Sequence, residues 1–307
     1  MPTEPGGGRL LRRVGLVVNP AAGNGRGRRL ADRLEEELRA GGATVLRRDT
    51  SGPGQATTLA RGLLGDGIDF LVACGGDGTV HDVVQVLAGT SCPLAVAPGG
   101  RGNDLARALG IPSDPARLAR MVLAGGTRRL DVGMAGPRRF TSVATLGFDS
   151  AVSARAARGI WGLQGQAAYV AAVLLALAQF RAPTVEIRGA KNAYRGRILL
   201  AATANTPMYG GGMQIAPGAV PDDGLFRVCL IREVPRPTVL RLLPQVISGS
   251  HIHHPAVEMW DTPFLEVQAD PPCVLYADGE PLGGTPIRLE IMPGALQVIV
   301  PAEQNSS

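Results

Sequence analysis

At the centre of the sequence lies Phe70-Leu71-Val72-Ala73-Cys74-Gly75-Gly76-Asp77-Gly78-Thr79. The first half of this segment is a short apolar run, which predicts a buried strand. Apolar residues then recur at helical spacing from Val80 to Ala88, and Gly89 ends the run, so a helix should follow the glycines. A Gly-rich turn between a strand and a helix brings unpaired N–H groups to the positive end of a helix dipole, which favours an anion. We therefore expect a phosphate-binding turn, with a plain tight turn as the alternative.

The residue types in this turn indicate what it binds. Gly75, Gly76 and Gly78 would permit positive φ angles and a close approach of the backbone to a ligand. Asp77 is unexpected beside phosphate, because a carboxylate repels it. It makes sense as a ligand of Mg²⁺, directly or through water, or as an acceptor of hydrogen bonds from the ligand. In the structural alternative, Asp77 and Thr79 only cap the helix.

Two further Gly-rich loops follow predicted strands in the first part of the chain. One begins at Asn19-Pro20 and includes Gly23, and the other runs over residues 98–104. Strands and helices alternate up to residue 133, which predicts an α/β domain with a doubly wound parallel sheet. Ligands of such sheets bind at the carboxyl ends of the strands, where all three loops would lie. Asn103 or Asp104 should cap the helix after the third loop, and the next helix should be bounded by Asp114, Pro115 and Gly125.

Beyond residue 133 the pattern changes to short strands, which predicts a second, β-rich domain. We expect a nucleotide-binding domain over 1–133 and an acceptor domain over 134–301, with the active site in the cleft between them and the tail 302–307 packing back on the first. Two helices are expected, at 165–180 and 237–248. Strands are expected at 140–145, 184–188, 197–204, 225–231, 264–269, 273–277, 287–292 and 296–300.

Composition narrows the class of protein. The 307 residues suffice for two domains, and 45% hydrophobic with 19% charged residues is typical of a soluble globular protein. The net charge of +5 suits phosphate ligands or an anionic membrane surface, although a genome that prefers Arg would give the same value. The 4% of aromatic residues disfavours nucleic-acid binding by base stacking. Four scattered cysteines, with neither a signal peptide nor a membrane-spanning run, indicate a cytoplasmic protein.

Several motifs, in one order over nearly the whole chain, resemble the diacylglycerol kinase catalytic family, which also holds bacterial lipid kinases, sphingosine kinases and ceramide kinases. The central turn alone would also fit NAD kinases and phosphofructokinases, so it is the ordered set that is specific. The motifs are Asn19-Pro20 with its Gly-rich tail, Gly75 to Thr79, Pro98 to Asp104, Gly147-Phe148-Asp149, Gly210-Gly211-Gly212-Met213, Pro217 to Leu225 and Asp278-Gly279-Glu280.

The resemblance implies ATP at the first loops, a lipid acceptor between the domains, and phosphoryl transfer to a hydroxyl. The position of Glu280 matches the proton acceptor of bacterial members. A Mg²⁺ site would involve Asp223 and the backbone carbonyls of Val220 and Leu225. The residues expected to contact the nucleotide are Asn19, Pro20, Gly23, Gly75, Gly76, Asp77, Gly78, Thr79, Gly100, Arg101, Asn103 and Asp104.

The chemistry of the residues agrees with this reading. Phosphoryl transfer needs a phosphate cradle, a divalent ion and a group that orients or deprotonates the acceptor. The loops would supply the cradle, Asp77 and Asp223 hard oxygen ligands, and Glu280 the base, so Asp77 and Glu280 are the candidate catalytic residues. The alternative for Asp223-Gly224 and Asp278-Gly279 is a hairpin turn, because Asp-Gly is a strong hairpin signal.

Two features fit the family less directly. The third loop of the family usually has Thr at the position of Arg101, whose guanidinium would take over a phosphate contact or else point to solvent. His251, His253 and His254 lie close together, but no Cys or further His stands nearby at zinc spacing, so we favour a polar loop over a metal site.

These observations predict a cytoplasmic lipid kinase that depends on ATP and Mg²⁺ and works peripherally at the inner membrane surface. Diacylglycerol, giving phosphatidic acid, is the acceptor we favour, although the sequence does not name the lipid. We further expect a homodimer and no nucleic-acid partner. The alternatives are a kinase of a soluble small molecule, similar to an NAD kinase, and a nucleotide-binding regulator without catalysis.

Overall fold

The computed structural model describes residues 12–157 and 173–302. The first half of the helix expected at 165–180 and most of the tail 302–307 therefore lie outside the described residues. Within the described ranges the chain forms two compact units. Unit 1 holds residues 12–100, 110–128 and 297–302, and unit 2 holds 101–109, 129–157 and 173–296. The domain ranges expected from the sequence stay a prediction, because compactness does not show which segments fold independently.

Unit 1 is built on a parallel sheet, as the alternation of strands and helices predicts. The strand order is β15-β4-β3-β1-β2, of which β15 contributes only its last residues. Every residue of β3 is buried, which explains its continuous apolar sequence. The strands are β1 (Arg13–Val18), β2 (Thr44–Asp49), β3 (Phe70–Gly75), β4 (Leu94–Pro98) and β15 (Ile287–Ile299).

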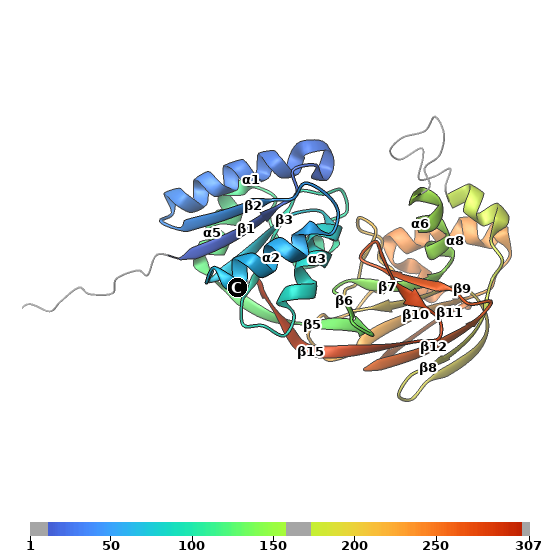
Figure 1. Cartoon of the computed structure of the whole chain (residues 1–307). Coiled ribbons are helices and arrows are strands. Elements are labelled where there is room, and N and C mark those ends of the chain that lie inside the picture. The colour runs from blue at the N-terminus through green and yellow to red at the C-terminus, as the bar shows by residue number, and fades with distance from the viewer. Residues whose placement is uncertain (1–11, 158–172, 303–307) are drawn as a thin grey trace, which may run out of the picture. The chain divides into compact units, whose positions relative to one another are not determined.

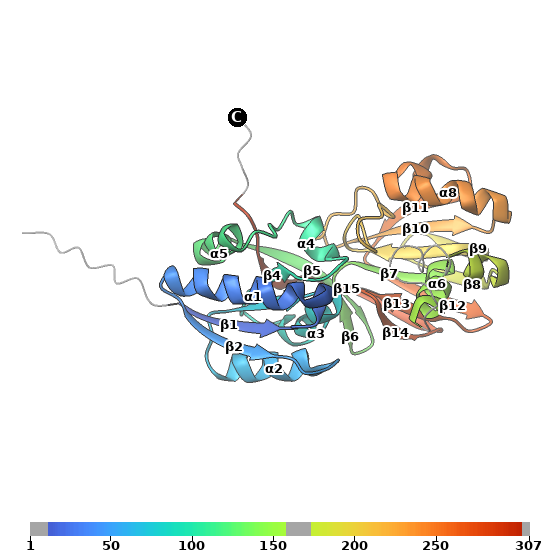
Figure 2. The same ribbon diagram turned by 90° about the horizontal axis from the view of Figure 1, so that it is seen from above.

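Helices cover both faces of this sheet. Helix α1 packs with α5, whereas α2 packs with α3, and the strands lie between α1 and α2 in Figures 1 and 2. Right-handed crossovers produce this arrangement once the strand order reverses after β2. At α5 the side chain of Asp114 accepts a hydrogen bond from the N–H of Arg117 at 2.9 Å, and Gly125 ends the helix at φ 71°, as predicted. The helices are α1 (Ala22–Ala40), α2 (Gln55–Gly65), α3 (Asp77–Leu87) and α5 (Pro115–Ala124).

Unit 2 is a β-sandwich with a layer of helices on one side (Figure 1). One sheet has the order β14-β13-β7-β9-β10-β11, and the second has β9-β8-β12-β15, with β5 paired to β15 and β6 paired to β5. Strand β9 is long enough to take part in both. The elements are α4 (Asp104–Ala108), β5 (Thr127–Ala135), β6 (Arg138–Phe140), β7 (Val143–Gly147), α6 (Phe148–Ala157), β8 (Thr184–Arg188), β9 (Ala193–Ala204), β10 (Phe226–Arg232), α8 (Arg236–Ser248), the 3₁₀ helix η1 (Ser250–His253), β11 (Val257–Thr262), β12 (Phe264–Asp270), β13 (Val274–Ala277) and β14 (Glu280–Gly284).

Strand β10 shows why this layering follows from sequence. Successive side chains of a strand point to opposite faces. Phe226, Val228 and Leu230 pack in the core between the two sheets. Cys229 and Ile231 pack on the other face, under α6, α8 and the helical segment 173–179. An uninterrupted apolar strand therefore builds two cores at once.

Several expected strands are wrong in detail. The strand expected at 140–145 is two strands, β6 and β7, and those expected at 287–292 and 296–300 are one, β15. Strand β14 was not expected because Pro281 and two glycines argue against a strand, yet an edge strand tolerates proline. Strand β11 was missed for a similar reason, since it is an edge strand that carries Glu258 and Asp261. Every helix among the described residues is too short or too polar to pass through a bilayer.

Candidate active site

The three Gly-rich loops expected to bind phosphate follow neighbouring strands of unit 1. They leave β1, β3 and β4, which end at the same edge of the sheet. The N–H groups of Gly99 and Gly100 donate to the carbonyl oxygen of Gly75, at 2.8 and 3.1 Å. The N–H of Asn19 donates to the carbonyl of Cys74 at 2.8 Å, and the guanidinium of Arg26 donates to the carbonyl of Gly100. The backbones of the loops are thus joined to one another.

Close packing, rather than backbone conformation, accounts for Gly75, the first of the three glycines of the central turn. We expected positive φ angles there, and this is wrong, because none of the three has one. A Cβ added to Gly75 would lie 2.3 Å from Oγ1 of Thr79, a distance that real Cβ atoms do not reach. A Cβ on Gly99 would lie 2.8 Å from Cα of Gly27. Positive φ occurs instead in the first loop, at Gly23 (58°) and Gly25 (85°), inside the first turn of α1.

Polar side chains also connect the first two loops. The amide Nδ2 of Asn19 donates to Oγ1 of the buried Thr79 at 3.4 Å, and Oδ1 of Asn19 accepts from the N–H of Ala21 at 3.1 Å. Asp77 is the first residue of α3 and is half-buried. A carboxylate in the first turn is stabilised by the helix dipole, so its place has a structural reason as well. The contacts expected between these residues, Pro20 among them, and a nucleotide stay a prediction.

The third loop ends in unit 2, where Asp104 has an unexpected role. We expected Asn103 or Asp104 to cap α4, and Asn103 does occupy the N-cap position, but its side chain forms no capping hydrogen bond there. The buried carboxylate of Asp104 instead accepts from the N–H groups of Gly210 and Gly211, both at 2.7 Å. It holds a glycine loop whose φ angles are all positive. Arg101 is exposed at the start of this segment.

The turn with the expected metal ligands is held by Asp131, which the sequence did not single out. Asp131 is 2% exposed, and its two oxygens accept from the N–H groups of Gly224 and Gly294, both at 2.7 Å. Its own N–H donates to the carbonyl of Pro221 at 2.7 Å. Charge-assisted bonds to backbone N–H groups stabilise a buried carboxylate. Asp131 therefore fixes the turn from both ends.

The donor set of this turn fits a hard cation. Asp223 is exposed, and its Oδ1 accepts from the N–H of Leu225 at 2.9 Å, which folds the turn around the carboxylate. One carboxylate with the carbonyls of Val220 and Leu225 gives only oxygen ligands, as Mg²⁺ prefers, and Mg²⁺ commonly keeps several waters. Among residues 12–157 and 173–302, no group of three or more His, Cys, Asp or Glu side chains is placed to hold a metal.

Glu280 follows a tight hairpin turn. Asp278 and Gly279 both have positive φ angles, 52° and 87°, and they connect β13 to β14. This is the hairpin that Asp-Gly predicts. The carboxylate of Asp278 accepts from the N–H groups of Thr141 and Ser142, at 2.9 and 3.0 Å. Asp278 is thus engaged in holding the turn, and Glu280 is left exposed beside it at the start of β14.

A buried asparagine joins the turn of Glu280 to the turn of Asp223. Nδ2 of Asn205 donates to the carbonyls of Asp131 and Thr141, both at 2.9 Å. The N–H of Asn205 also donates to the carbonyl of Ser142 at 2.8 Å. From the hairpin of Glu280 to the turn of Asp223, hydrogen bonds therefore pass through three side chains of unit 2: Asp278, Asn205 and Asp131. Neither Asn205 nor Asp131 stands in a motif that sequence reasoning recognises.

An apolar cavity of about 60 Å³ lies between the helical layer and the sheet of unit 2. Asp149, from the Gly147-Phe148-Asp149 motif, faces it together with Tyr209 and side chains of α8 such as Leu242. Oγ1 of Thr145 donates to the carboxylate of Asp149 at 2.9 Å, and Tyr209 forms a second hydrogen bond with it. Burial raises the pKa of Asp149 in spite of these bonds. Sequence reasoning named Asp149 only as part of a motif.

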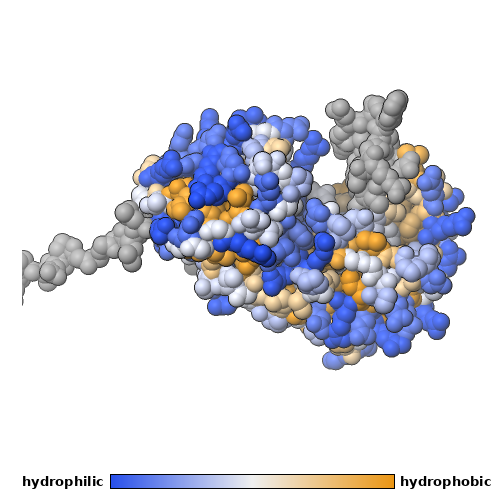
Figure 3. Space-filling view, in the orientation of Figure 1, coloured by the Kyte–Doolittle hydropathy of each residue, from blue (hydrophilic) through white to orange (hydrophobic). Residues whose placement is uncertain are grey.

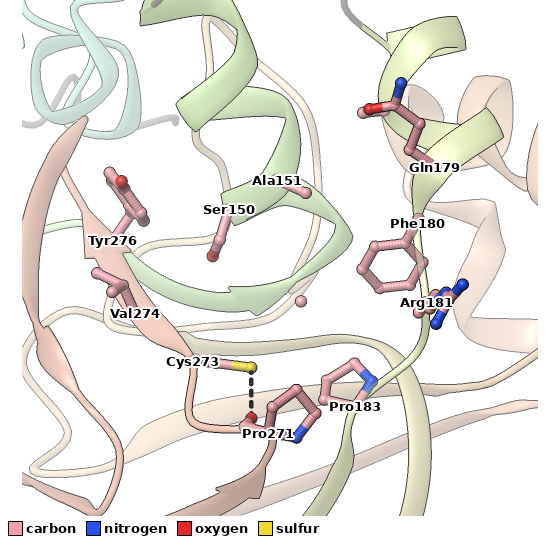
Figure 4. A pocket seen from close by; sticks show the side chains of 12 residues that line it. Ser150, Ala151, Gln179, Phe180, Arg181, Pro183, Pro271, Cys273, Val274 and Tyr276 are labelled. Carbon is pink, nitrogen blue, oxygen red and sulfur yellow. Dashed lines mark hydrogen bonds between the residues drawn. The ribbon is translucent and has the colours of Figure 1, made fainter.

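A larger pocket, of about 450 Å³, opens on the same unit (Figure 4). Ser150 and Ala151 line it from α6, Phe180 and Arg181 from the opposite wall, and Tyr276 from β13 (Figure 4). Most of its lining is apolar, so it is suited to hydrocarbon rather than to phosphate.

The histidines are not one polar loop, so that expectation is wrong for His251. His251 is fully buried, with Nε2 at 3.0 Å from the carbonyl oxygen of Ile215 and 3.6 Å from Sγ of Cys229. Burial lowers the pKa of this imidazole. His253 and His254 are at least partly exposed, and Nδ1 of His254 accepts from the N–H of Ala256 at 3.1 Å.

Comparison with known families finds two matching domains, one in each half of the chain. Residues 13–135 match the diacylglycerol kinase catalytic domain. Residues 142–300 match a domain described as the YegS C-terminal NAD kinase beta sandwich-like domain.

Relatives cover nearly the full chain. A diacylglycerol kinase of Mycobacterium tuberculosis is 32% identical over 95% of this chain and 96% of its own length. A protein of Pseudomonas fluorescens, described as "probable lipid kinase YegS-like", is 34% identical over 87% of this chain and 89% of its own. A crystal structure of a diacylglycerol kinase from Bacillus anthracis superposes with a TM-score of 0.75 at 20% identity, over 95% of this chain and 98% of that one. This last likeness shows the fold alone.

Proposed function

The chain belongs to the diacylglycerol kinase catalytic family, and on that premise we propose that it is an ATP- and Mg²⁺-dependent lipid kinase. It transfers the γ-phosphoryl group of ATP to the hydroxyl of a lipid. Diacylglycerol is the acceptor we propose, with phosphatidic acid as the product. The reaction takes place at the inner surface of the membrane, where the acceptor is found.

The observation that carries this proposal is the hydrogen-bond path from Asp278 through Asn205 to Asp131. Phosphoryl transfer is catalysed mainly by positioning and by stabilising charge. A proton acceptor and a metal turn serve one reaction only if they are held in register. Here the hairpin of Glu280 and the turn of Asp223 share that path, although the two residues are 57 positions apart in the sequence.

Each candidate site residue has its own role in the proposed phosphoryl transfer. Glu280 accepts the proton of the acceptor hydroxyl, for which an exposed carboxylate on a rigid hairpin is suited. Asp223, with the carbonyls of Val220 and Leu225, holds Mg²⁺, which would neutralise charge on the phosphates. The joined loops of unit 1, with Asp77 at the start of α3, bind the nucleotide through backbone N–H groups.

The test is to incubate the protein with labelled ATP and Mg²⁺, offering diacylglycerol in mixed micelles, phosphatidylglycerol in mixed micelles, or NAD in solution. We expect phosphatidic acid as the main product. Phosphorylated NAD as the main product would replace the lipid kinase with a kinase of a soluble acceptor. Binding of ATP without turnover on any acceptor would identify a nucleotide-binding regulator instead.

A further inference from the structure

The helices that cover the sandwich of unit 2 expose apolar side chains. Hydrophilic side chains predominate on the face seen in Figure 3, with apolar ones in small groups between them. Large hydrophobic side chains are exposed at six positions of the described chain, and only Val220 and Val274 lie outside this helical layer. The other four are Leu174 (51% exposed), Leu175 (37%), Leu240 (47%) and Ile247 (62%). Exposed apolar side chains that gather in this way mark interaction surfaces.

Helix α8 is apolar on two faces. Its inner face carries Val239, Leu242 and Val246, which are buried and line the cavity of Asp149. Its outer face carries a second apolar row at i, i+3, i+7 and i+10, a spacing that keeps the side chains on one side of a helix. The row consists of Pro237, Leu240, Pro244 and Ile247, and all four are exposed. Packing of the core explains the first face and leaves the second unexplained.

The charged residues of α8 itself are all positive. Helix α8 contains no acidic residue, and its Arg236 and Arg241 are exposed. Arg181, just beyond the helical segment 173–179, is exposed as well. None of these three guanidiniums forms an ion pair with a described residue. The acidic residue nearest in sequence, Glu233, is paired with Arg197 at 3.1 Å.

The two exposed segments are neighbours in the helical layer. The guanidinium of Arg236 donates to the carbonyl oxygen of Ala178 at 3.0 Å, which ties the start of α8 to the end of the segment carrying Leu174 and Leu175. Ala176 and Leu177 of that segment pack in the same core as Val239. We call the outer row of α8, with Leu174 and Leu175, the apolar ridge.

We propose that the apolar ridge docks this protein on an anionic phospholipid bilayer. A helix with an exposed apolar face and guanidiniums beside it lies in the plane of a membrane interface, with its apolar face among the acyl chains and its cations at the headgroups. Each Lys or Arg near an anionic surface strengthens such binding, and the net charge of +5 acts in the same direction. The inference extends the proposed function, because a lipid kinase must reach an acceptor that stays in the membrane.

The test measures binding of the full-length protein to sedimented vesicles of phosphatidylcholine, with or without phosphatidylglycerol. The double variant Leu240→Gln/Ile247→Gln should weaken binding at least about tenfold, because it removes two half-exposed side chains from the acyl region. Arg241→Gln should reduce the preference for phosphatidylglycerol. Lys191→Gln is a control at an exposed position elsewhere on unit 2, and it should bind as the unaltered protein does. Because the altered residues are exposed, the variants should unfold at the same temperature as the unaltered protein. If the double variant does not fold, the single variants Leu240→Ser and Ile247→Ser test the same surface with a smaller change.

The possible outcomes distinguish a failure of the docking proposal from a failure of the proposed function. Vesicle binding that is lost only in the ridge variants supports the proposal, even if no lipid is phosphorylated, in which case the proposed function alone fails. Equal binding by ridge and control variants overturns it, as does an unaltered protein that binds no vesicles. A ridge variant that changes from dimer to monomer while its vesicle binding persists also overturns it, because the ridge would then contact a second copy of the chain. Activity on a short-chain diacylglycerol dissolved as monomers should be the same for ridge variants and unaltered protein.

Discussion

Replacement of Asn205 by alanine should weaken the fold of unit 2 and disturb its two functional turns together. Asn205 is 1% exposed, and its Nδ2 donates to two carbonyl oxygens, those of Asp131 and Thr141, both at 2.9 Å. Alanine leaves both carbonyls buried without this donor, and each orphaned group costs about 1–3 kcal/mol. The Oδ1 atom of Asn205 is itself buried without a hydrogen-bond partner, so its removal offsets part of the loss. We therefore expect the free energy of unfolding to fall by about 2–4 kcal/mol.

The same substitution should lower the turnover number more than the affinity for ATP. Asn205 lies between the Glu280 hairpin and the Asp223 turn, and a misplacement of about 1 Å in a catalytic group can cost about 10²-fold in rate. The first loop and the central turn, which hold most of the expected nucleotide contacts, belong to unit 1, so the KM for ATP should change little. Urea unfolding gives the first quantity, and steady-state kinetics with diacylglycerol micelles gives the other two.

The matched control is Asn192→Ala, at an exposed position in the turn between β8 and β9 of the same unit. A surface change of this kind should alter the free energy of unfolding by less than about 0.5 kcal/mol. The reasoning is refuted if Asn205→Ala is as mild as this control. It is also refuted if the variant raises the KM for ATP while leaving the turnover number intact.

Four further predictions address single residues. Glu280→Gln should lower the turnover number by about 10²–10⁴-fold with ATP binding unchanged, and a loss within about threefold would remove Glu280 as the base. Gly75→Ala should weaken nucleotide affinity and stability, because its Cβ would lie 2.3 Å from Oγ1 of Thr79. The control Gly62→Ala in α2, where a Cβ has nothing within 4 Å, should be neutral or stabilising. Equal effects of the two substitutions would contradict the packing argument. Asp149→Asn should stabilise the protein at pH 7. The raised pKa of Asp149 means that the folded state holds the proton to higher pH than the unfolded state does, so the ionised carboxylate lowers stability as the pH rises. The gain in the free energy of unfolding from Asn should therefore vanish in unfolding experiments below about pH 4, where Asp149 is protonated in both states. Arg101→Ala should raise the KM for ATP more than that for the lipid, and an unchanged KM for ATP would place the guanidinium in solvent.

Local signals account for most of unit 1. The apolar run of β3 and the helical spacing after it are properties of adjacent residues, and so are the Asp114, Pro115 and Gly125 signals that bound α5. The Asp278-Gly279 turn is equally local, because Asp-Gly favours the positive φ angles that a two-residue hairpin needs. The ordered motifs add the family, which the comparisons confirm.

The edge strands are elements that local sequence signals fail to predict. Strands β11 and β14 carry charges, proline or glycine, which a sequence pattern reads as loop, and only pairing with β10 and β13 makes them strands. The sequence places the glycines of the central turn correctly, but the positive φ angles that it predicts for them are absent. Thr79 crowds Gly75 at a distance that depends on how the strand enters the helix.

The sequence by itself determined the alternation of strands and helices, the position of the Gly-rich loops, the hairpin before Glu280 and the family. Only the tertiary structure decided which carboxylates hold the site together. Asp104 binds backbone groups 106 and 107 residues away, Asp278 binds groups 136 and 137 residues away, and Asp131 binds one 93 residues away. A periodicity or a turn signal extends over a few residues because it reflects the local backbone. The partner of a buried carboxylate is set instead by the packing of distant segments, and nothing in the neighbouring sequence specifies it.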